Sequence, residues 1–385
     1  MRLNAYIMKL FLFILGCFLV GGCQVKTTLK DVDYSGMDTI LFISGVKSLY
    51  MDDTDYPQSG HIRYYEGSGK SYLVQGNESQ KMIRVYDYTS GKKLQTVDVD
   101  MRDGEFFAYN LDTAFVISKG KSNVRILTWN KGEKATINVS VTVKKHQVEQ
   151  YPRCRLNGAS FAGGKWFFPC YRIGEYPAEM MTGKERFPLL AVDLETNSYE
   201  YVGAYPEVYA SNNMGTLNYW VPEICRGLNN GSVVVGFRAS SEIMIYSPET
   251  KEMRFESVKS VYADTIPLPL TEKGRNYFNE QDSYYYYAQY SHYGAMSYDP
   301  WKKVYYRFVG IGLNDWDLKP SPYLQEQKKW SVMVFDTNFR KLGEQYLGDL
   351  YNVNYHFVSP DGLFVLNNDK NEDVANYTLL KYIKE

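Results

Sequence analysis

The sequence has little net charge, and after its first 22 residues it has no long apolar run. No stretch beyond Cys23 approaches the about 20 consecutive apolar residues that a membrane-spanning helix needs. The formal charge of −1 over 385 residues gives no basic footprint for nucleic acid and no polybasic patch for a membrane surface. We therefore expect no nucleic-acid partner, and we expect partners that are recognised by shape and local chemistry.

Catalytic and metal-binding motifs are also missing. The chain contains no GxSxG, HExxH or P-loop pattern, and no GxGxxG that follows a strand. None of its five cysteines belongs to a CxxC pair or to a Cys/His spacing typical of a metal site. The motifs therefore indicate no cofactor and no catalytic residue.

The longest apolar run lies in the first 22 residues, MRLNAYIMKLFLFILGCFLVGG. Arg2 and Lys9 supply positive charge, and Leu10 to Val20 are eleven almost wholly apolar residues. This run is too short to span a bilayer and predicts a cleaved signal peptide over residues 1–22. Cys23, which follows Val-Gly-Gly, resembles the lipidated cysteine of a bacterial lipobox. In the alternative, the segment is an ordinary secretory signal and Cys23 is incidental.

Lipidation of Cys23 would make the membrane itself a partner of the mature protein. Acyl chains contribute about 0.8 kcal/mol per buried CH₂, so two or three chains hold a soluble domain at a bilayer surface. We predict this anchor, with residues 23–37 as a tether.

Three cysteines remain once the signal has been removed and Cys23 has been lipidated: Cys154, Cys170 and Cys225. They allow at most one disulfide, with three pairings, in an oxidising compartment. In the alternative all three are buried free thiols.

Strand patterns repeat along the rest of the chain. Aromatic residues make up 16% of the sequence, and helical periodicity is hard to find after the signal. Six apolar runs are typical of fully buried strands, each after a tight turn: YLVQ at 72, AFVIS at 114, KWFFPC at 165, SVVVGF at 232, KVYYRF at 303 and LFVLN at 363. An alternating strand follows each run, and a further strand completes five of the six units. This cadence predicts blades of four antiparallel strands.

The sixth unit lacks its fourth strand, whereas DTILFISGV, residues 38–46, precedes the first unit without a partner. Placed as the outer strand of the last blade, this segment closes a ring. We therefore predict an all-β fold, a six-bladed β-propeller over residues 38–385 closed by the N-terminal strand joining the C-terminal blade. The alternatives are a β-sandwich or two stacked domains, and neither explains the unpaired first strand.

Four segments carry a family resemblance: SYDPWKK at 297, YYRF at 305, VMVFDTNFRKLGE at 332 and FVSPDGLFV at 357. Over most of residues 30–385, and most strongly after about residue 230, the chain resembles an uncharacterised family of Bacteroidetes lipoproteins with a TolB-like six-bladed propeller. That family is known only as a domain of unknown function. The resemblance implies a location in the cell envelope, at the outer membrane, and supplies no catalytic residues. Because Gln24 to Thr27 include no acidic tract of the kind associated with surface export in such lipoproteins, we expect the anchor to face the periplasm.

Long connections collect on one face of the predicted propeller. In each blade, the turns from strand A to B and from C to D share one face, and the B–C loops and the crossings between blades share the other. The long connections, residues 172–187, 206–220, 263–289 and 313–329, all fall on the second face. Loops of this length are uncommon unless they serve a function.

These connections are rich in aromatic residues, which suit stacking on sugar rings or gripping peptides. We predict that this face binds a glycan, a peptide or an envelope protein through Tyr176, Tyr209, Tyr219, Trp220, Tyr277, Trp316 and Tyr323. In the alternative, the loops fold over one another and the aromatics form their own core.

Inner strands line the central channel of a propeller. Aligning them on their turns places one polar residue from each blade at corresponding positions: His61, Glu105, Asn157, Glu223, Tyr293 and Asn354. One interpretation is a divalent-cation site, as in six-bladed lactonase-type hydrolases. The other, which we favour, is a water-filled channel whose groups satisfy one another, because one residue of slip reverses the facing of a side chain.

Together these patterns predict an envelope-anchored lipoprotein whose propeller binds a ligand or a protein, without catalysis and without a cofactor. The alternative is a metal-dependent, lactonase-like hydrolase that uses a divalent cation in the central channel. A third interpretation is a purely structural role in an envelope assembly.

Overall fold

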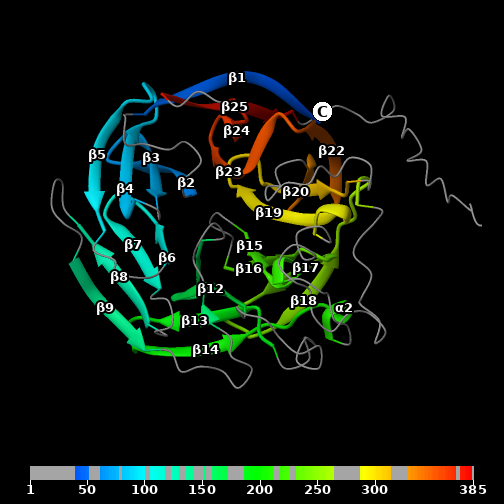
Figure 1. The fold of residues 1–385 in the computed structure, drawn as a ribbon. Helices are drawn as coiled ribbons and strands as arrows, with labels where there is room; N and C mark the ends of the chain where they lie inside the picture. Colours follow the sequence, from blue (N-terminus) through cyan, green and yellow to red (C-terminus); the bar gives the residue numbers. More distant parts are fainter. Residues whose placement is uncertain are drawn as a thin grey trace, which may run out of the picture. The chain divides into compact units, whose positions relative to one another are not determined.

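Figure 1 shows the computed structural model, which describes residues 40–51, 61–77, 80–99, 105–117, 123–129, 136–142, 151–152, 158–171, 186–210, 217–225, 231–263, 287–313, 328–369 and 373–383. The chain divides into two compact units, residues 1–38 and 39–385. All described residues belong to the second unit. The predicted signal peptide, Cys23 and the tether therefore lie outside the described residues.

The described strands form six antiparallel sheets arranged in a ring (Figure 1). The first blade contains β2 (His61–Gly67), β3 (Lys70–Asn77), β4 (Met82–Asp87) and β5 (Lys93–Asp98). The second contains β6 (Glu105–Ala108), β7 (Thr113–Ile117), β8 (Asn123–Thr128) and β9 (Thr136–Thr142). In the third, β10 (Tyr151–Pro152) and β11 (Ser160–Ala162) both pair with β12 (Lys165–Tyr171), and β13 (Leu189–Asp193) and β14 (Ser198–Val202) follow.

The other three blades repeat this order. The fourth contains β15 (Pro222–Ile224), β16 (Val233–Phe237), β17 (Ser240–Tyr246) and β18 (Met253–Ser257). The fifth contains β19 (His292–Asp299), β20 (Val304–Ile311), β21 (Lys329–Asp336) and β22 (Lys341–Gly348). The sixth contains β23 (Tyr351–Ser359), β24 (Gly362–Asn367), β25 (Val374–Tyr382) and β1 (Leu41–Tyr50). Two short helices, α2 (Glu207–Ala210) and η3 (Leu217–Trp220), lie between the third and fourth blades in sequence.

The ring closes as the sequence predicts. β1 pairs antiparallel with β25 from Leu41 opposite Tyr382 to Tyr50 opposite Val374, and it is the outermost strand of the sixth sheet. The six-bladed propeller is therefore confirmed, and the sandwich and stacked-domain alternatives are wrong.

Six apolar clusters fill the interfaces between neighbouring blades. Val74 and Phe106, for example, share the cluster between the first and second blades. Leu73 and Phe364 share the cluster that joins the first blade to the sixth. Because each sheet is covered on both faces, its middle strands are apolar throughout instead of alternating, as in β24 with the sequence GLFVLN. The same packing turns side chains of the inner and middle strands toward the neighbouring blades.

Arg307 on β20 ties the fifth blade to the fourth. Its guanidinium donates to the backbone carbonyls of Phe237 at 2.9 Å, Ser240 at 3.0 Å and Ser241 at 3.2 Å. It also lies 4.1 Å from the centroid of the Tyr293 ring. Burial lowers the pKa of Arg307 to about 10, so the side chain stays charged at neutral pH.

Two of the three cysteines that follow Cys23 in the sequence are described. Cys170 and Cys225 are buried and free, as in the free-thiol alternative, and Cys154 lies outside the described residues. In the described part of the chain, neither helix has the length and apolar character of a membrane span.

Candidate functional site

Three of the aromatic residues that we expected on the long-loop face are core residues. Tyr209, Tyr219 and Trp220 are each at most 1% exposed and belong to the cluster between the third and fourth blades. The Tyr209 hydroxyl donates to the Tyr219 carbonyl at 2.8 Å and accepts from the Ala239 N–H at 2.8 Å. For these three, exposure to a ligand was the wrong prediction, because α2 and η3 fold back onto the blade interface. The other four, Tyr176, Tyr277, Trp316 and Tyr323, lie outside the described residues.

The predicted channel positions do not converge on one point. His61, at the start of β2 in the first blade, packs against the second blade: its ring lies 4.4 Å from that of Phe107 between centroids, and its Nε2 accepts from the Ala108 N–H at 2.6 Å. Tyr293 packs against the fourth blade, under Arg307. The prediction assumed that these inner-strand side chains point into the channel. Because the blades pack face to face, the side chains point toward the neighbouring blades instead.

The remaining channel positions are equally dispersed. Glu223 forms an ion pair with Arg238 of its own blade, at 2.6 Å. Glu105 is buried at the start of β6, Asn354 is exposed on β23, and Asn157 lies outside the described residues. Within the described ranges, no three His, Cys, Asp or Glu side chains form a set that could hold a metal ion.

A buried polar cluster that the sequence did not reveal lies between the fourth and fifth blades. The Lys328 ammonium donates to the Tyr290 carbonyl at 2.7 Å and lies 3.0 Å from His292 Nδ1. The other ring nitrogen of His292, Nε2, lies 2.6 Å from the Tyr287 hydroxyl. Burial lowers the pKa of His292 well below its usual 6.5, and the positive charges of Lys328 and Arg238 lower it further. His292, Lys328 and Tyr287 are buried and matched to one another, so they join the start of β21 to the segment that leads into β19.

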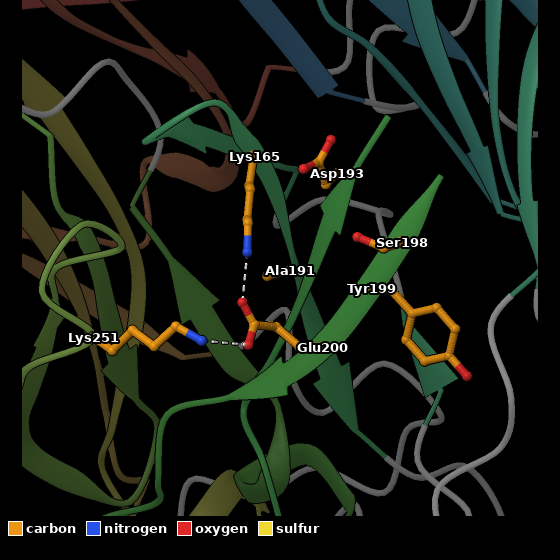
Figure 2. A pocket seen from close by; sticks show the side chains of 7 residues that line it. All are labelled: Lys165, Ala191, Asp193, Ser198, Tyr199, Glu200 and Lys251. Atoms are coloured by element: carbon orange, nitrogen blue, oxygen red, sulfur yellow. Dashed lines mark hydrogen bonds and ion pairs between the residues drawn. The ribbon is translucent and has the colours of Figure 1, made fainter. Parts of the chain in front are cut away.

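Figure 2 shows a charged surface pocket of about 220 Å³ across the third and fourth blades. Glu200 on β14 lies between two lysines, with Lys165 at 2.6 Å and Lys251 at 3.2 Å. The hydrogen bond from Lys165 is the main reason that the pKa of Glu200 is lowered. Asp193 also lines this pocket, so two carboxylates balance the two lysines, and the ion pairs of Glu200 link the third blade to the fourth.

A larger pocket, of about 320 Å³, opens among the inner strands. Four blades contribute to its lining: Ile62, Arg63, Tyr64, Tyr65 and Glu66 from the first, Tyr109 from the second, Ser297, Tyr298, Pro300 and Trp301 from the fifth, and His356, Phe357 and Val358 from the sixth. Pro300 and Trp301 belong to the A–B turn of the fifth blade, so this central pocket opens on the face of the A–B turns. Its volume is at the lower end of the about 300–1,000 Å³ typical of small-molecule sites.

Arg63 is the distinctive side chain of the central pocket. Its guanidinium carbon lies 5.1 Å from the centroid of the Phe107 ring and 5.2 Å from that of Tyr109. Its Nη1 is buried and has no hydrogen-bond partner in the structure. Burial lowers the pKa of Arg63, and the one opposing influence is Tyr109, so no carboxylate compensates the charge. Glu66, the acidic residue of the lining, is exposed at the pocket rim.

Trp301 is held at the pocket mouth by a local turn. Asp299 Oδ1 accepts from the backbone N–H of Trp301 at 3.0 Å and of Lys302 at 2.8 Å. Such an Asp-capped turn fixes the backbone without help from the rest of the fold. The Trp301 ring stands edge-on to Tyr64 at 5.6 Å and remains 44% exposed. The SYDPWKK segment thus builds a rigid support for an accessible indole.

Ser297 and His356 form the polar floor of the central pocket. Their side chains lie 2.9 Å apart, between Ser297 Oγ and His356 Nε2, and His356 Nδ1 lies 2.7 Å from the Val353 carbonyl. A proton on Nδ1 satisfies that carbonyl and leaves Nε2 to accept from the serine. A catalytic serine and its general base show the same hydrogen bond. Here, however, both side chains are buried, and the bond joins the fifth blade to the sixth. We assign it to blade packing.

Comparisons with known proteins agree with this architecture. The sequence profile of a family described as a domain of unknown function (DUF4221) matches residues 38–346. A crystal structure of a member of that family from Bacteroides vulgatus is similar with a TM-score of 0.68 at 18% identity, over 89% of this chain and 97% of that one. A second, from Bacteroides fragilis, is named as a candidate exported protein and has a TM-score of 0.52 at 12% identity, over 90% and 96% of the two chains. No curated protein matches the chain.

Proposed function

This chain belongs to a family of domains of unknown function, DUF4221, and from that premise we propose that it is an envelope-anchored propeller that binds a small ligand in its central pocket, without catalysis. The observation that carries the proposal is the pocket itself. It combines an exposed indole with a charged group that the protein leaves unmatched. Ligand sites commonly consist of a mostly apolar lining with a few polar groups that fix orientation.

The location of this activity rests on the N-terminal sequence. An eleven-residue apolar segment after a basic start, followed by Val-Gly-Gly-Cys, supports export and lipidation of Cys23 at the outer membrane, facing the periplasm. The B. fragilis relative named as a candidate exported protein supports the same compartment. Replacing Cys23 with Ala should move the protein from the membrane fraction to the soluble fraction, because no acyl chain is attached. Membrane retention of that variant would contradict the anchor.

A binding panel tests the pocket. We expect at least one member of a panel of glycans, short peptides and small metabolites to bind the wild-type protein, and Trp301→Ala to weaken that binding at least about tenfold, because stacking on an aromatic ring is lost. Isothermal titration calorimetry measures the effect.

The matched control is Phe161→Ala, which removes another half-exposed aromatic ring, 39% exposed, from the third blade outside the pocket lining. This control should bind as the wild type does. The proposal fails if no panel member binds, or if Trp301→Ala and Phe161→Ala behave alike.

A further inference from the structure

We infer that the ligand of the central pocket carries an anionic oxygen group, a carboxylate or a phosphate, on a sugar or aromatic ring, with Arg63 holding the anion and Trp301 packing on the ring. This inference rests on the proposed function and names the class of molecule that the pocket takes.

The charge of Arg63 is the first reason to expect an anionic ligand. A buried charged group is normally paired or fully hydrogen-bonded, because removal from water is costly. Arg307 follows this rule at both Nη atoms, with three backbone carbonyls as acceptors, while its Nε has none. Arg63 does not, since its buried Nη1 has no acceptor and its contacts are the two aromatic rings of Phe107 and Tyr109. An anion in the pocket would supply the missing acceptor.

The geometry of the Arg63 guanidinium is the second reason to expect an anionic ligand. Stacking on aromatic rings occupies the face of a guanidinium and leaves its N–H groups, which lie in the plane, to bond elsewhere. Those N–H groups form a fork that matches the two oxygens of a carboxylate or phosphate. The rings under Arg63 also hold the side chain in place before a ligand arrives, which reduces the entropy lost on binding.

The position of Trp301 is the reason to expect that the ligand also carries a ring. Both Arg63 and Trp301 line the same volume of about 320 Å³, which suits a molecule of one or two rings. The half-exposed indole, fixed by the Asp299 turn, offers a flat apolar surface at the pocket mouth. A ligand that reaches both groups must therefore combine a ring with an anionic substituent.

The test compares three probes by isothermal titration calorimetry on the full mature protein. Glucuronate carries a carboxylate on a sugar ring, phenyl phosphate carries a phosphate on an aromatic ring, and methyl glucoside is neutral. We expect glucuronate, phenyl phosphate or both to bind at least about tenfold more tightly than methyl glucoside, because charge-assisted hydrogen bonds form only with the anions. The two anionic probes distinguish a carboxylate source from a phosphate source.

Variants assign the preference to Arg63. Arg63→Gln should reduce the affinity for the anionic probe at least about tenfold, and Arg63→Lys should restore part of it, because a lysine keeps the charge but not the fork. Arg254→Gln, which removes an exposed arginine paired with Glu256 on the fourth blade, is the matched control and should change nothing. Circular dichroism and thermal melting confirm that each variant is folded.

Three results would overturn the inference: Arg63→Gln binds the anionic probe as tightly as the wild type does, methyl glucoside binds as tightly as the anions, or no anionic probe binds at millimolar concentration. In each case the proposed function survives if a panel member still binds and Trp301→Ala still removes that binding, so failure of the inference and failure of the proposed function can be told apart.

Discussion

Two aromatic-rich regions of this propeller use their polar groups differently. Around Trp220, between the third and fourth blades, the rings are buried and the hydroxyls of Tyr205 and Tyr209 donate to backbone carbonyls, although the Trp220 indole N–H has no partner. Around Trp301, in the central pocket, the indole is 44% exposed and Arg63 keeps a buried nitrogen without an acceptor. Aromatic content therefore does not mark a site in this fold. The mark is an exposed ring beside a charged group without an acceptor, in the lining of one pocket.

Arg307, which is buried, and Arg63, which is partly buried, make the same comparison at the level of single residues. Arg307 and Arg63 both pack on aromatic rings, and burial lowers the pKa of each. Arg307 satisfies three carbonyls of the neighbouring blade, whereas Arg63 satisfies none. We conclude that the first stabilises the ring and the second is available to a ligand.

The largest difference in stability should appear between variants of the two tryptophans, Trp220 and Trp301. Trp220→Ala should lower the free energy of unfolding by about 3–5 kcal/mol, because it leaves a cavity in a blade interface. Trp301→Ala should cost less than about 1 kcal/mol, since nearly half of its surface already faces solvent. Urea denaturation of both variants measures the contrast, and equal losses would remove the distinction between the regions.

The losses of unfolding free energy on replacing Arg307 and Arg63 should differ almost as much as those for the two tryptophans. Arg307→Gln should lower the free energy of unfolding by roughly 3 kcal/mol, because it takes donors away from buried carbonyls. Arg63→Gln should be neutral or slightly stabilising, because it removes a desolvated charge without breaking a hydrogen bond. A loss for Arg63→Gln as large as that for Arg307→Gln, in the same denaturation experiment, would show that Arg63 is a structural residue.

Acid should weaken the interface between the fourth and fifth blades. The pKa of His292 is depressed in the fold, where the ring lies among Tyr287, Trp330 and Lys328 and near the charge of Arg238. Its stabilising contribution is therefore present above the unfolded pKa of 6.5 and is lost as the pH falls below it, because the unfolded chain binds the proton first.

The slope of this loss is at most about 1.4 kcal/mol per pH unit for one group. The variant His292→Gln lacks the ionisable ring and should show a flatter dependence of unfolding free energy between about pH 7 and pH 5. Parallel curves for the variant and the wild type would assign the acid sensitivity to another group.

The smallest effect should come from the charged surface pocket. Lys251→Ala removes the longer of the two ion pairs of Glu200, and the lysine side chain is 67% exposed. We expect a change of less than about 0.5 kcal/mol that disappears in high salt. A larger loss in chemical denaturation would mean that this pocket, and not the blade cores alone, stabilises the contact between the third and fourth blades.

The ring of blades could be predicted from the sequence because each strand and turn leaves a local sequence pattern. Sheets covered on both faces need continuous apolar runs, tight turns separate those runs, and the unpaired segment at residues 38–46 had one vacant position to fill. The site could not be predicted in the same way. Arg63, Tyr109, Trp301 and His356 come from four blades and meet only at the axis.

The alignment of inner strands failed for a related reason. It treated one side-chain position per blade as facing the channel, but packing between blades turned His61 toward Phe107 and Tyr293 toward Arg307. The signal that could have found the pocket is the SYDPWKK turn. There, an aspartate two residues before a tryptophan fixes an indole in an exposed position.

The most direct test of the central pocket is a crystal structure of the protein grown with whichever anionic probe binds, glucuronate or phenyl phosphate. The account predicts the anionic group within hydrogen-bond distance of the Arg63 guanidinium and the ring of the probe against Trp301. A probe seated on the long-loop face, or a central pocket that contains only water at saturating probe, would contradict it.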